Sequence, residues 1–526
     1  MKKASSTPWQ SRPQRFFWWL CAVCLSVYLA YAAYLSQSAV LTSTVATISA
    51  LLWFVVIAAG TFTFLQRFST LTWKTRASTE RKKLDLRVFA AGFGVSLAIL
   101  AIFLMADYPG GVTVDSAVQW TQAQTHQYSN WHPVFHTLLL QLGAALYNSH
   151  AFVVALQCGA FSLAMGYLIA TLHAWGIRAL WLLMVEAVLV ASPIVGNTMM
   201  YLWKDNAMTM GVAVLFAQCV NLYFSRGTWL EKRQNALAFG LALAFTTLVR
   251  HNAILFTLPL LATAALCYRK QLRGTIVAAT ALVVTLALVW GPLYSALNVK
   301  YPNNKLEESI GVPMTIVCNV RKQNPDALDA ETRAFTDRMG DAAAWDAYRL
   351  DTYNSIKFGK TREAVSRSTL AEVLGMAVRT AQADPRGAFE AVNGVTDLVW
   401  GLNNEGAANV NVRNSGDLPT VVRQSGRMNQ LGNALKTLLT APLSLDVLGW
   451  YLGNLGVSFA AMLILAIRAI RRSGASALLL CLPTLLYNLA TMCVLCGNDA
   501  RFFSYSPLLC TMALFVLPRD LPESIQ

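Results

Sequence analysis

Charged residues are scarce in this 526-residue sequence, in which Asp, Glu, Lys and Arg together make up 13% of the chain. A soluble globular domain is about one quarter charged, whereas 55% of this chain is hydrophobic. These values exclude an ordinary soluble domain and predict an all-α polytopic membrane protein. Acidic residues are the scarcer charged class, at 27 against 42 basic residues, which gives a formal net charge of +15.

Sequence motifs of soluble enzymes, and those of small domains stabilised by disulfides or zinc, are also missing. The sequence contains no glycine-rich phosphate-binding loop, no zinc-ligand spacing and no nucleophile elbow. Most of the ten cysteines lie inside apolar runs, where we interpret them as small buried hydrophobic residues. Neither a structural metal nor a disulfide framework is therefore expected.

The excess positive charge is concentrated in short segments between apolar runs. This positive-inside pattern orients a membrane protein and requires no nucleic-acid partner. The segments predicted to be cytoplasmic are the N-terminus, 66–87, 173–178, 225–234, 269–274, 468–474 and 519–526. The basic N-terminus lacks a convincing cleavage site, so we expect the first apolar run to be a spanning helix and not a removed signal peptide.

A membrane-spanning helix requires about twenty apolar residues. The segments that satisfy this are 17–36, 43–65, 88–106, 152–172, 178–196, 207–224, 235–250, 252–268, 275–295, 444–467, 475–496 and 502–518. Residues 133–148 are apolar but short, and counting them as a span would place the later basic segments outside. We expect them to form a helix at the outer surface. The sequence thus predicts twelve spans in a bacterial plasma membrane, with both termini cytoplasmic.

Composition divides the chain into four parts. Residues 1–87 are predicted to form a two-helix membrane segment, and residues 88–295 a transmembrane core whose first outer loop is 107–150. Residues 296–443 carry most of the acidic residues and predict a helical, soluble extracytoplasmic domain between spans nine and ten. Residues 444–526 are predicted to form a C-terminal three-helix membrane segment.

Ionisable and other polar residues gather where the predicted spans reach the outer face. They come from four segments of the chain: Asp107, Asp115, His132 and His136; Lys204 and Asp205; Arg250, His251 and Asn252; Asp499 and Arg501. Taken alone, Asp115 is equally consistent with a helix cap, and Lys204–Asp205 with an interfacial ion pair. Because ionisable groups near lipid are costly, convergence of four segments on one face favours a functional site.

The order of these motifs resembles the GT-C class, which are integral-membrane glycosyltransferases that use polyprenyl-phosphate-linked sugars. The string Asp115-Ser-Ala-Val-Gln-Trp resembles the Asp-(Glu/Ser)-x-x-x-(Tyr/Trp) segment of that class, and the run from His132-Pro-Val-Phe to His136 resembles its His-Pro helix. The strings Tyr108-Pro-Gly, Trp131-His-Pro, Trp203-Lys-Asp and Arg250-His-Asn are similar to an uncharacterised bacterial branch. The resemblance covers residues 88–295, and 499–507 more weakly.

The resemblance implies transfer of a sugar from a polyprenyl-phosphate donor to a glycan or lipid acceptor of the cell envelope, with inversion and with membrane lipid around the site. Asp115 is the candidate base, and Asp107 and Asp205 are its reserves. The residues expected to bind substrate or leaving phosphate are His132, His136, Lys204, Arg250, His251, Asn252, Asp499 and Arg501. Ser116 stands where the class often has a second acidic residue, which leaves a possible divalent cation open.

Three other classes of protein remain open from the sequence. An oligosaccharide ligase or polymerase also combines twelve spans with a large outer loop, but such enzymes resemble one another in using His and Arg from that loop, and 296–443 contains no histidine. A twelve-span transporter predicts internal symmetry and ionisable groups at the middle of the membrane. A non-catalytic scaffold or lipid-binding protein would tolerate loss of Asp115.

Overall fold

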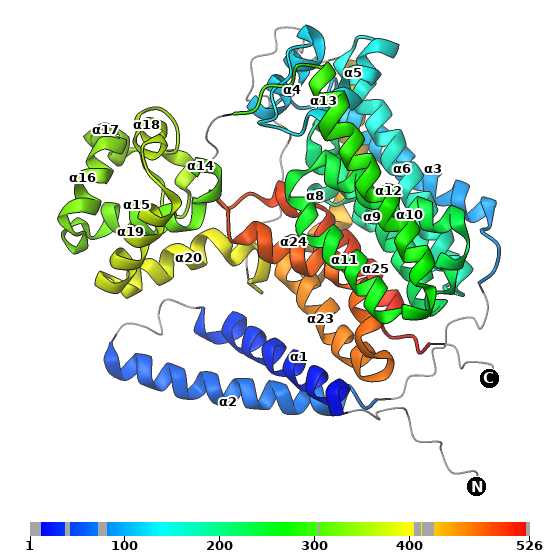
Figure 1. Ribbon diagram of the computed structural model, residues 1–526, viewed down its shortest axis with the longest axis horizontal. Helices are drawn as coiled ribbons and strands as arrows, with labels where there is room; N and C mark the ends of the chain where they lie inside the picture. Colours follow the sequence, from blue (N-terminus) through cyan, green and yellow to red (C-terminus); the bar gives the residue numbers. More distant parts are fainter. Residues whose placement is uncertain are drawn as a thin grey trace.

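The computed structural model describes residues 12–36, 43–71, 81–302, 306–403, 412 and 426–521 (Figure 1). Within these ranges the chain is helical and contains no strand, only two isolated β-bridges. Six helices are long and apolar enough to cross a membrane, or up to eight if each of two bent helix pairs is one span. The predicted all-α class with several candidate spans is therefore confirmed.

The longest apolar helices form the candidate spans. They are α1 (Arg12–Ala30) continued by η1 (Tyr31–Leu35), α2 (Thr44–Phe68), α3 (Leu86–Ala106), α6 (His150–Ala174), α9 (Lys204–Phe224) and α12 (Leu272–Leu288) extended by its flanking turns. Glycine allows some of them to approach closely: a Cβ added at Gly166 of α6 would lie 2.7 Å from the Phe89 carbonyl oxygen of α3. Such small residues at a helix interface are typical of membrane bundles.

Two of the expected straight spans are bent. Helix α7 (Ala179–Ala191) meets the segment that begins with α8 (Pro193–Gly196) at 65°, because proline lacks an N–H and disfavours helical backbone at the residue before it. Helix α22 (Asp446–Gly453) meets α23 (Leu455–Ser473) at 85°. There the extended backbone of Asn454 interrupts the helical hydrogen bonding.

The remaining apolar segments form shorter helices. They are α10 (Arg233–Val249), α11 (Ile254–Cys267), α24 (Leu482–Met492) and α25 (Tyr505–Val516). The expected span 475–496 divides into a 3-10 turn, η11 (Gly474–Leu480), and the short α24, which has Pro483 in its first turn. The prediction of twelve spans is not tested by these helix lengths.

Helices α4 (Val114–Thr125) and α5 (Val134–Leu146) lie together at one end of the bundle, at the top of Figure 1. Helix α5 has 13 residues and is therefore about 20 Å long, too short for a hydrocarbon core of about 30 Å. This length agrees with the expectation that 133–148 does not span. Helix α4 and the turn between α4 and α5 carry Asp115 and His132 of the candidate site.

A second hydrophobic core, separate from that of the bundle, lies in the helices at the left of Figure 1. These helices are α14 (Leu306–Ser309), α15 (Gly311–Gln323), α16 (Ala330–Met339), α17 (Ala342–Asp346), α18 (Lys360–Ser366) and α19 (Leu370–Ala383). In contrast, α20 (Pro385–Trp400) packs on α15 and on α23, and α21 (Arg427–Thr440) packs on α3. The later part of 296–443 thus connects this unit to the bundle.

Candidate functional site

Asp115 lies in the first turn of α4, but it does not cap the helix. Thr113 is the N-cap, and its side chain forms a capping box with Ser116. The Asp115 carboxylate is therefore left to interact with other segments, at a helix N-terminus whose dipole favours negative charge. The structural interpretation of Asp115 as a cap is thus wrong, and its side chain is one third exposed.

Arg501 connects two of the candidate carboxylates. Its Nη1 lies 3.1 Å from Asp115 Oδ2, and its Nε lies 2.9 Å from Asp499 Oδ2. Asp499 also caps the 3-10 turn η12 (Ala500–Phe503) by accepting a hydrogen bond from the Arg501 backbone N–H. The guanidinium carbon is 5.3 Å from the ring centre of Trp203, a distance typical of cation–π contacts.

His132 lies between Lys204 and Asp115. The Lys204 ammonium, at the start of α9, donates to His132 Nδ1 over 3.0 Å. The imidazole proton is therefore on Nε2, which lies 3.9 Å from Asp115 Oδ1. Burial and the nearby Lys204 charge lower the pKa of His132 to about 3. His132 is thus neutral and turns an N–H toward Asp115.

These contacts determine the charge on Asp115. Burial alone raises the pKa of its carboxyl, but the cations Arg501 and Lys204, with His132, outweigh burial and hold the pKa well below its usual range. Asp115 is consequently an ionised carboxylate and a weak base while Arg501 contacts it. We call Asp115, His132, Lys204, Asp499 and Arg501 the Asp115 cluster.

A second ion pair is buried behind this cluster. Arg250, which follows α10, pairs with Asp205, and both side chains are less than one tenth exposed. The Arg250 guanidinium carbon lies 5.0 Å from the ring centre of Phe502 and 5.6 Å from that of Tyr487. Because its carboxylate is bound by a buried guanidinium, Asp205 is poorly suited to act as a base.

His136 lies in the first turn of α5, four residues after His132. It is 2% exposed, and its Nδ1 lies 3.3 Å from the Gln119 side-chain oxygen of α4. Gln119 also donates to the Thr137 hydroxyl over 3.1 Å. Burial, together with the Lys204 charge, lowers the pKa of His136 to about 3. We therefore assign His136 to the packing between α4 and α5 and not to direct substrate contact.

The structure uses the other expected site residues differently. Asp107 ends α3 and forms an ion pair with Lys436 of α21, with Nζ 2.6 Å from Oδ2. His251 begins the 3-10 turn η5 (His251–Ala253), and its Nε2 lies 3.2 Å from the Asn130 side-chain oxygen. Asn252 is half-buried in the same turn. Neither the Asp107–Lys436 ion pair nor the His251–Asn130 contact requires a substrate.

Several aromatic and polar residues support the site without having been predicted as its members. Trp203 donates from Nε1 to the Thr113 hydroxyl over 2.9 Å and stacks on Tyr201 at 4.0 Å between ring centres. This contact fixes the α4 N-terminus against the start of α9. The Trp203-Lys-Asp string in the sequence could have indicated a role for Trp203. No sequence pattern indicates Lys436, because it contacts Asp107 only in the folded chain.

The chemistry of the cluster does not suit a divalent cation. No group of three or more His, Cys, Asp or Glu side chains in the described ranges is arranged to hold a metal. The oxygens of Asp115 face Arg501 and the N–H of His132, and positive neighbours of this kind favour an anion.

Comparison with known proteins gives no matching family model, no matching curated protein and no matching solved structure. The description of the chain as a helical protein with several candidate membrane spans rests on its own sequence and structure.

Proposed function

We propose that this chain is a membrane glycosyltransferase that moves a sugar from a polyprenyl-phosphate donor to a cell-envelope acceptor at the Asp115 cluster. The observation that carries the proposal is the contact between the partly exposed Asp115 carboxylate and the Arg501 guanidinium. A carboxylate can take a proton from an acceptor hydroxyl, and a guanidinium can bind a phosphate through two N–H groups. Both are needed for this reaction, and here they are adjacent.

In the proposed step, the acceptor oxygen forms a bond to the anomeric carbon as the bond from that carbon to the phosphate oxygen breaks. The acceptor proton passes to Asp115, and the bonding electrons leave with the phosphate. Arg501 and Lys204 stabilise the negative charge that develops on the leaving phosphate. A single displacement of this kind inverts the configuration at the anomeric carbon.

Donor binding would also change the basicity of Asp115. In the structure, Arg501 holds the pKa of the Asp115 carboxyl well below its usual range, opposing the effect of burial. A bound phosphate competes for the Arg501 guanidinium and neutralises part of its charge. The pKa of Asp115 then rises, which makes the carboxylate a better base only when the donor is in place.

The arrangement of the helices supports a site at one membrane face. Lys204 begins α9 at the cluster, and Tyr223 at the other end of that helix donates to Ser473 over 2.9 Å. The 21 residues of α9 extend about 30 Å, the thickness of a bilayer core. Ser473 adjoins Arg471 and Arg472, and by the positive-inside rule these basic residues support an extracytoplasmic position for the Asp115 cluster. The twelve-span topology and an outer location for 296–443 belong to this proposal.

The proposal is tested with purified protein in lipid and a small panel of polyprenyl-phosphate sugars. We expect saturable binding of one donor, and release of polyprenyl phosphate when an acceptor is added. Movement of an intact sugar across the membrane would instead indicate a transporter. Turnover only with a diphosphate-linked oligosaccharide would indicate a ligase. Absence of binding to every donor in the panel would contradict the proposal.

A further inference from the structure

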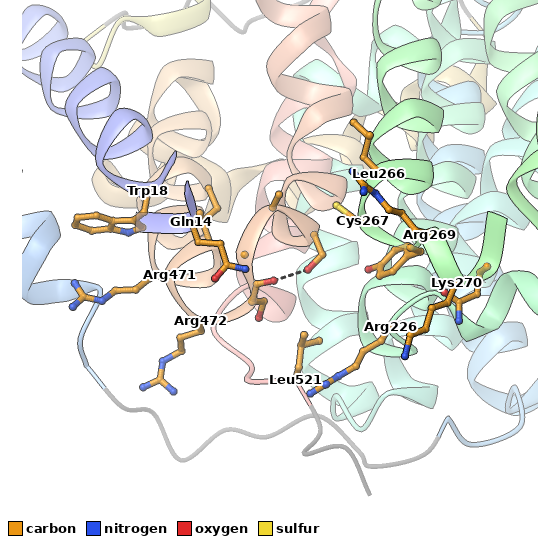
Figure 2. A pocket seen from close by; sticks show the side chains of 17 residues that line it. Gln14, Trp18, Arg226, Leu266, Cys267, Arg269, Lys270, Arg471, Arg472 and Leu521 are labelled. Carbon is orange, nitrogen blue, oxygen red and sulfur yellow. Dashed lines mark hydrogen bonds between the residues drawn. The ribbon is translucent and has the colours of Figure 1, made fainter. Parts of the chain in front are cut away.

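A concave site lies at the opposite end of α9 from the Asp115 cluster. It is a cavity of about 690 Å³ between the start of α1, the turn after α9, the turn after α11 and the C-terminal end of α23. Figure 2 shows Arg471 and Arg472 on one side of the cavity, and Arg226, Arg269 and Lys270 on the other. No part of the proposed glycosyl transfer uses this cavity.

The lining of this cavity carries charge of one sign. Five basic side chains line it, and none of the described lining residues is acidic. Their segments are far apart in the sequence, so the folding of the chain, and not a single basic run, brings them together. The positive-inside rule explains basic residues at this end of the bundle, but it does not require them to surround one hollow.

The two sides of the cavity hold their cations differently. Arg471 donates to the Ser69 hydroxyl over 2.9 Å, and Arg472 pairs with Asp520 at 3.1 Å. These contacts fix one side. Arg269 and Lys270, in the short turn η6 (Arg269–Gln271), are exposed and make no ion pair with any residue that the structure describes. An anion in the cavity would supply the charge that this side lacks.

The cavity also has an apolar part. Trp18, Leu266 and Ile470 belong to its lining, and the Leu266 side chain is 65% exposed. Basic residues beside the exposed Leu266, with the buried Trp18 and Ile470 also in the lining, match a lipid, whose phosphate is anionic and whose chains are apolar. A small soluble anion would use only the basic residues.

We propose that this cavity binds the phosphate group of an anionic membrane lipid. Arg269 and Lys270 would contact the phosphate, with Arg471 and Arg472 opposite, and the lipid chains would pass along Leu266. This proposal does not depend on the glycosyltransferase proposal, because the two sites lie at opposite ends of α9.

The test compares binding of short-chain phosphatidylglycerol, short-chain phosphatidylcholine and inorganic phosphate to the full chain in neutral detergent. The variant pair is R269Q/K270Q. The matched control is K232Q/R233Q, which removes the same charge from exposed residues outside the cavity lining. We expect phosphatidylglycerol to bind at least about tenfold more tightly than phosphatidylcholine. R269Q/K270Q should weaken its binding by roughly 10- to 30-fold, and the control by less than about threefold.

Two outcomes would overturn the proposal. Equal losses of phosphatidylglycerol affinity in R269Q/K270Q and K232Q/R233Q would show that lipid binding depends only on the overall charge at this end of the helix bundle. Equal affinity for inorganic phosphate and for phosphatidylglycerol would assign the cavity to a soluble phosphate compound and not to a lipid. Unchanged elution and thermal unfolding of both variants would confirm that the comparison is made on folded protein.

Discussion

The Arg501 guanidinium lies 3.1 Å from the Asp115 carboxylate, although Asp115 belongs to α4 and Arg501 to η12, in the C-terminal part of the chain. The same guanidinium contacts Asp499. Arg501 therefore connects η12 to α4 and sets the charge of the residue proposed as the base.

The first prediction concerns the fork of N–H groups on Arg501. In R501K, a single ammonium cannot contact Asp115 and Asp499 while also binding a phosphate through two N–H groups. We expect donor affinity to fall by roughly 10- to 100-fold, measured by titrating the protein with the donor. The control is R321K, because Arg321 pairs with Asp337 in the separate helical unit. Unchanged donor affinity in R501K would remove Arg501 from the phosphate site.

The second prediction concerns the protonation of His132. The Lys204 charge is one cause of the low pKa of His132, after burial, and K204M removes it. The pKa of His132 should rise from about 3 toward the ordinary value of 6.5, because the negative charge of Asp115 raises this pKa and the positive charge of Lys204 no longer lowers it. NMR titration of labelled histidine measures this shift, with the signal assigned by its loss in H132Q. A pKa that does not move would contradict the Lys204–His132 hydrogen bond.

The third prediction is a dependence of stability on pH. The pKa values of His132 and His136 are lowered by burial and then by Lys204 to about 3, from 6.5. The unfolded chain therefore binds more protons below pH 6.5, so the stability from these residues is complete above 6.5 and falls as the pH drops toward 3. Each histidine should cost about 1.4 kcal/mol per pH unit in this window.

Thermal unfolding in detergent between pH 7.5 and pH 5.5 measures this loss. The variant H136Q cannot titrate at that position, so its stability should decline less steeply over the same range. Asp115 does not contribute to the pH dependence in this window. Arg501 and Lys204 outweigh the effect of burial and hold the pKa of its carboxyl well below the window. Equal stability at both pH values would contradict the neutral, buried state of the two histidines.

The fourth prediction separates Asp107 from catalysis. Its ion pair with Lys436 joins α3 to α21, and the Asp107 side chain is only 6% exposed. K436M leaves this carboxylate without its lysine and should destabilise the protein by about 3–5 kcal/mol. The double variant D107N/K436M should recover much of that loss and should retain sugar transfer. Loss of transfer in a stable D107N protein would return Asp107 to the list of candidate bases.

The sequence was sufficient to predict features that depend on local patterns. The apolar runs predicted the helices, and the length of 133–148 predicted a helix too short to span. The sequence also predicted that Asp115, Lys204 and Arg501 converge. The basic segments alternate with the predicted spans, and this alternation assigns the helix ends that carry the three residues to the same face.

Features that depend on contacts between distant segments were not predicted. The bend at Asn454 has no strong local signal, and Lys436 meets Asp107 only through the packing of α21 on α3. The low pKa of Asp115, set by Arg501 and Lys204 against burial, likewise requires the folded geometry. The sequence makes Asp115 a candidate base, but it does not show that Arg501 lowers the pKa of this carboxyl against the effect of burial and so weakens it as a base.

The most direct test of the proposed function measures donor binding and sugar transfer together in D115N, beside D326N as a control at a 93% exposed carboxylate of the helical unit that pairs with Arg333. If Asp115 is the base, D115N should bind the polyprenyl-phosphate sugar about as well as the parent, while transfer falls by roughly 10²- to 10⁴-fold. D326N should be unchanged in both measurements. Transfer at the parental rate by folded D115N would contradict the central claim.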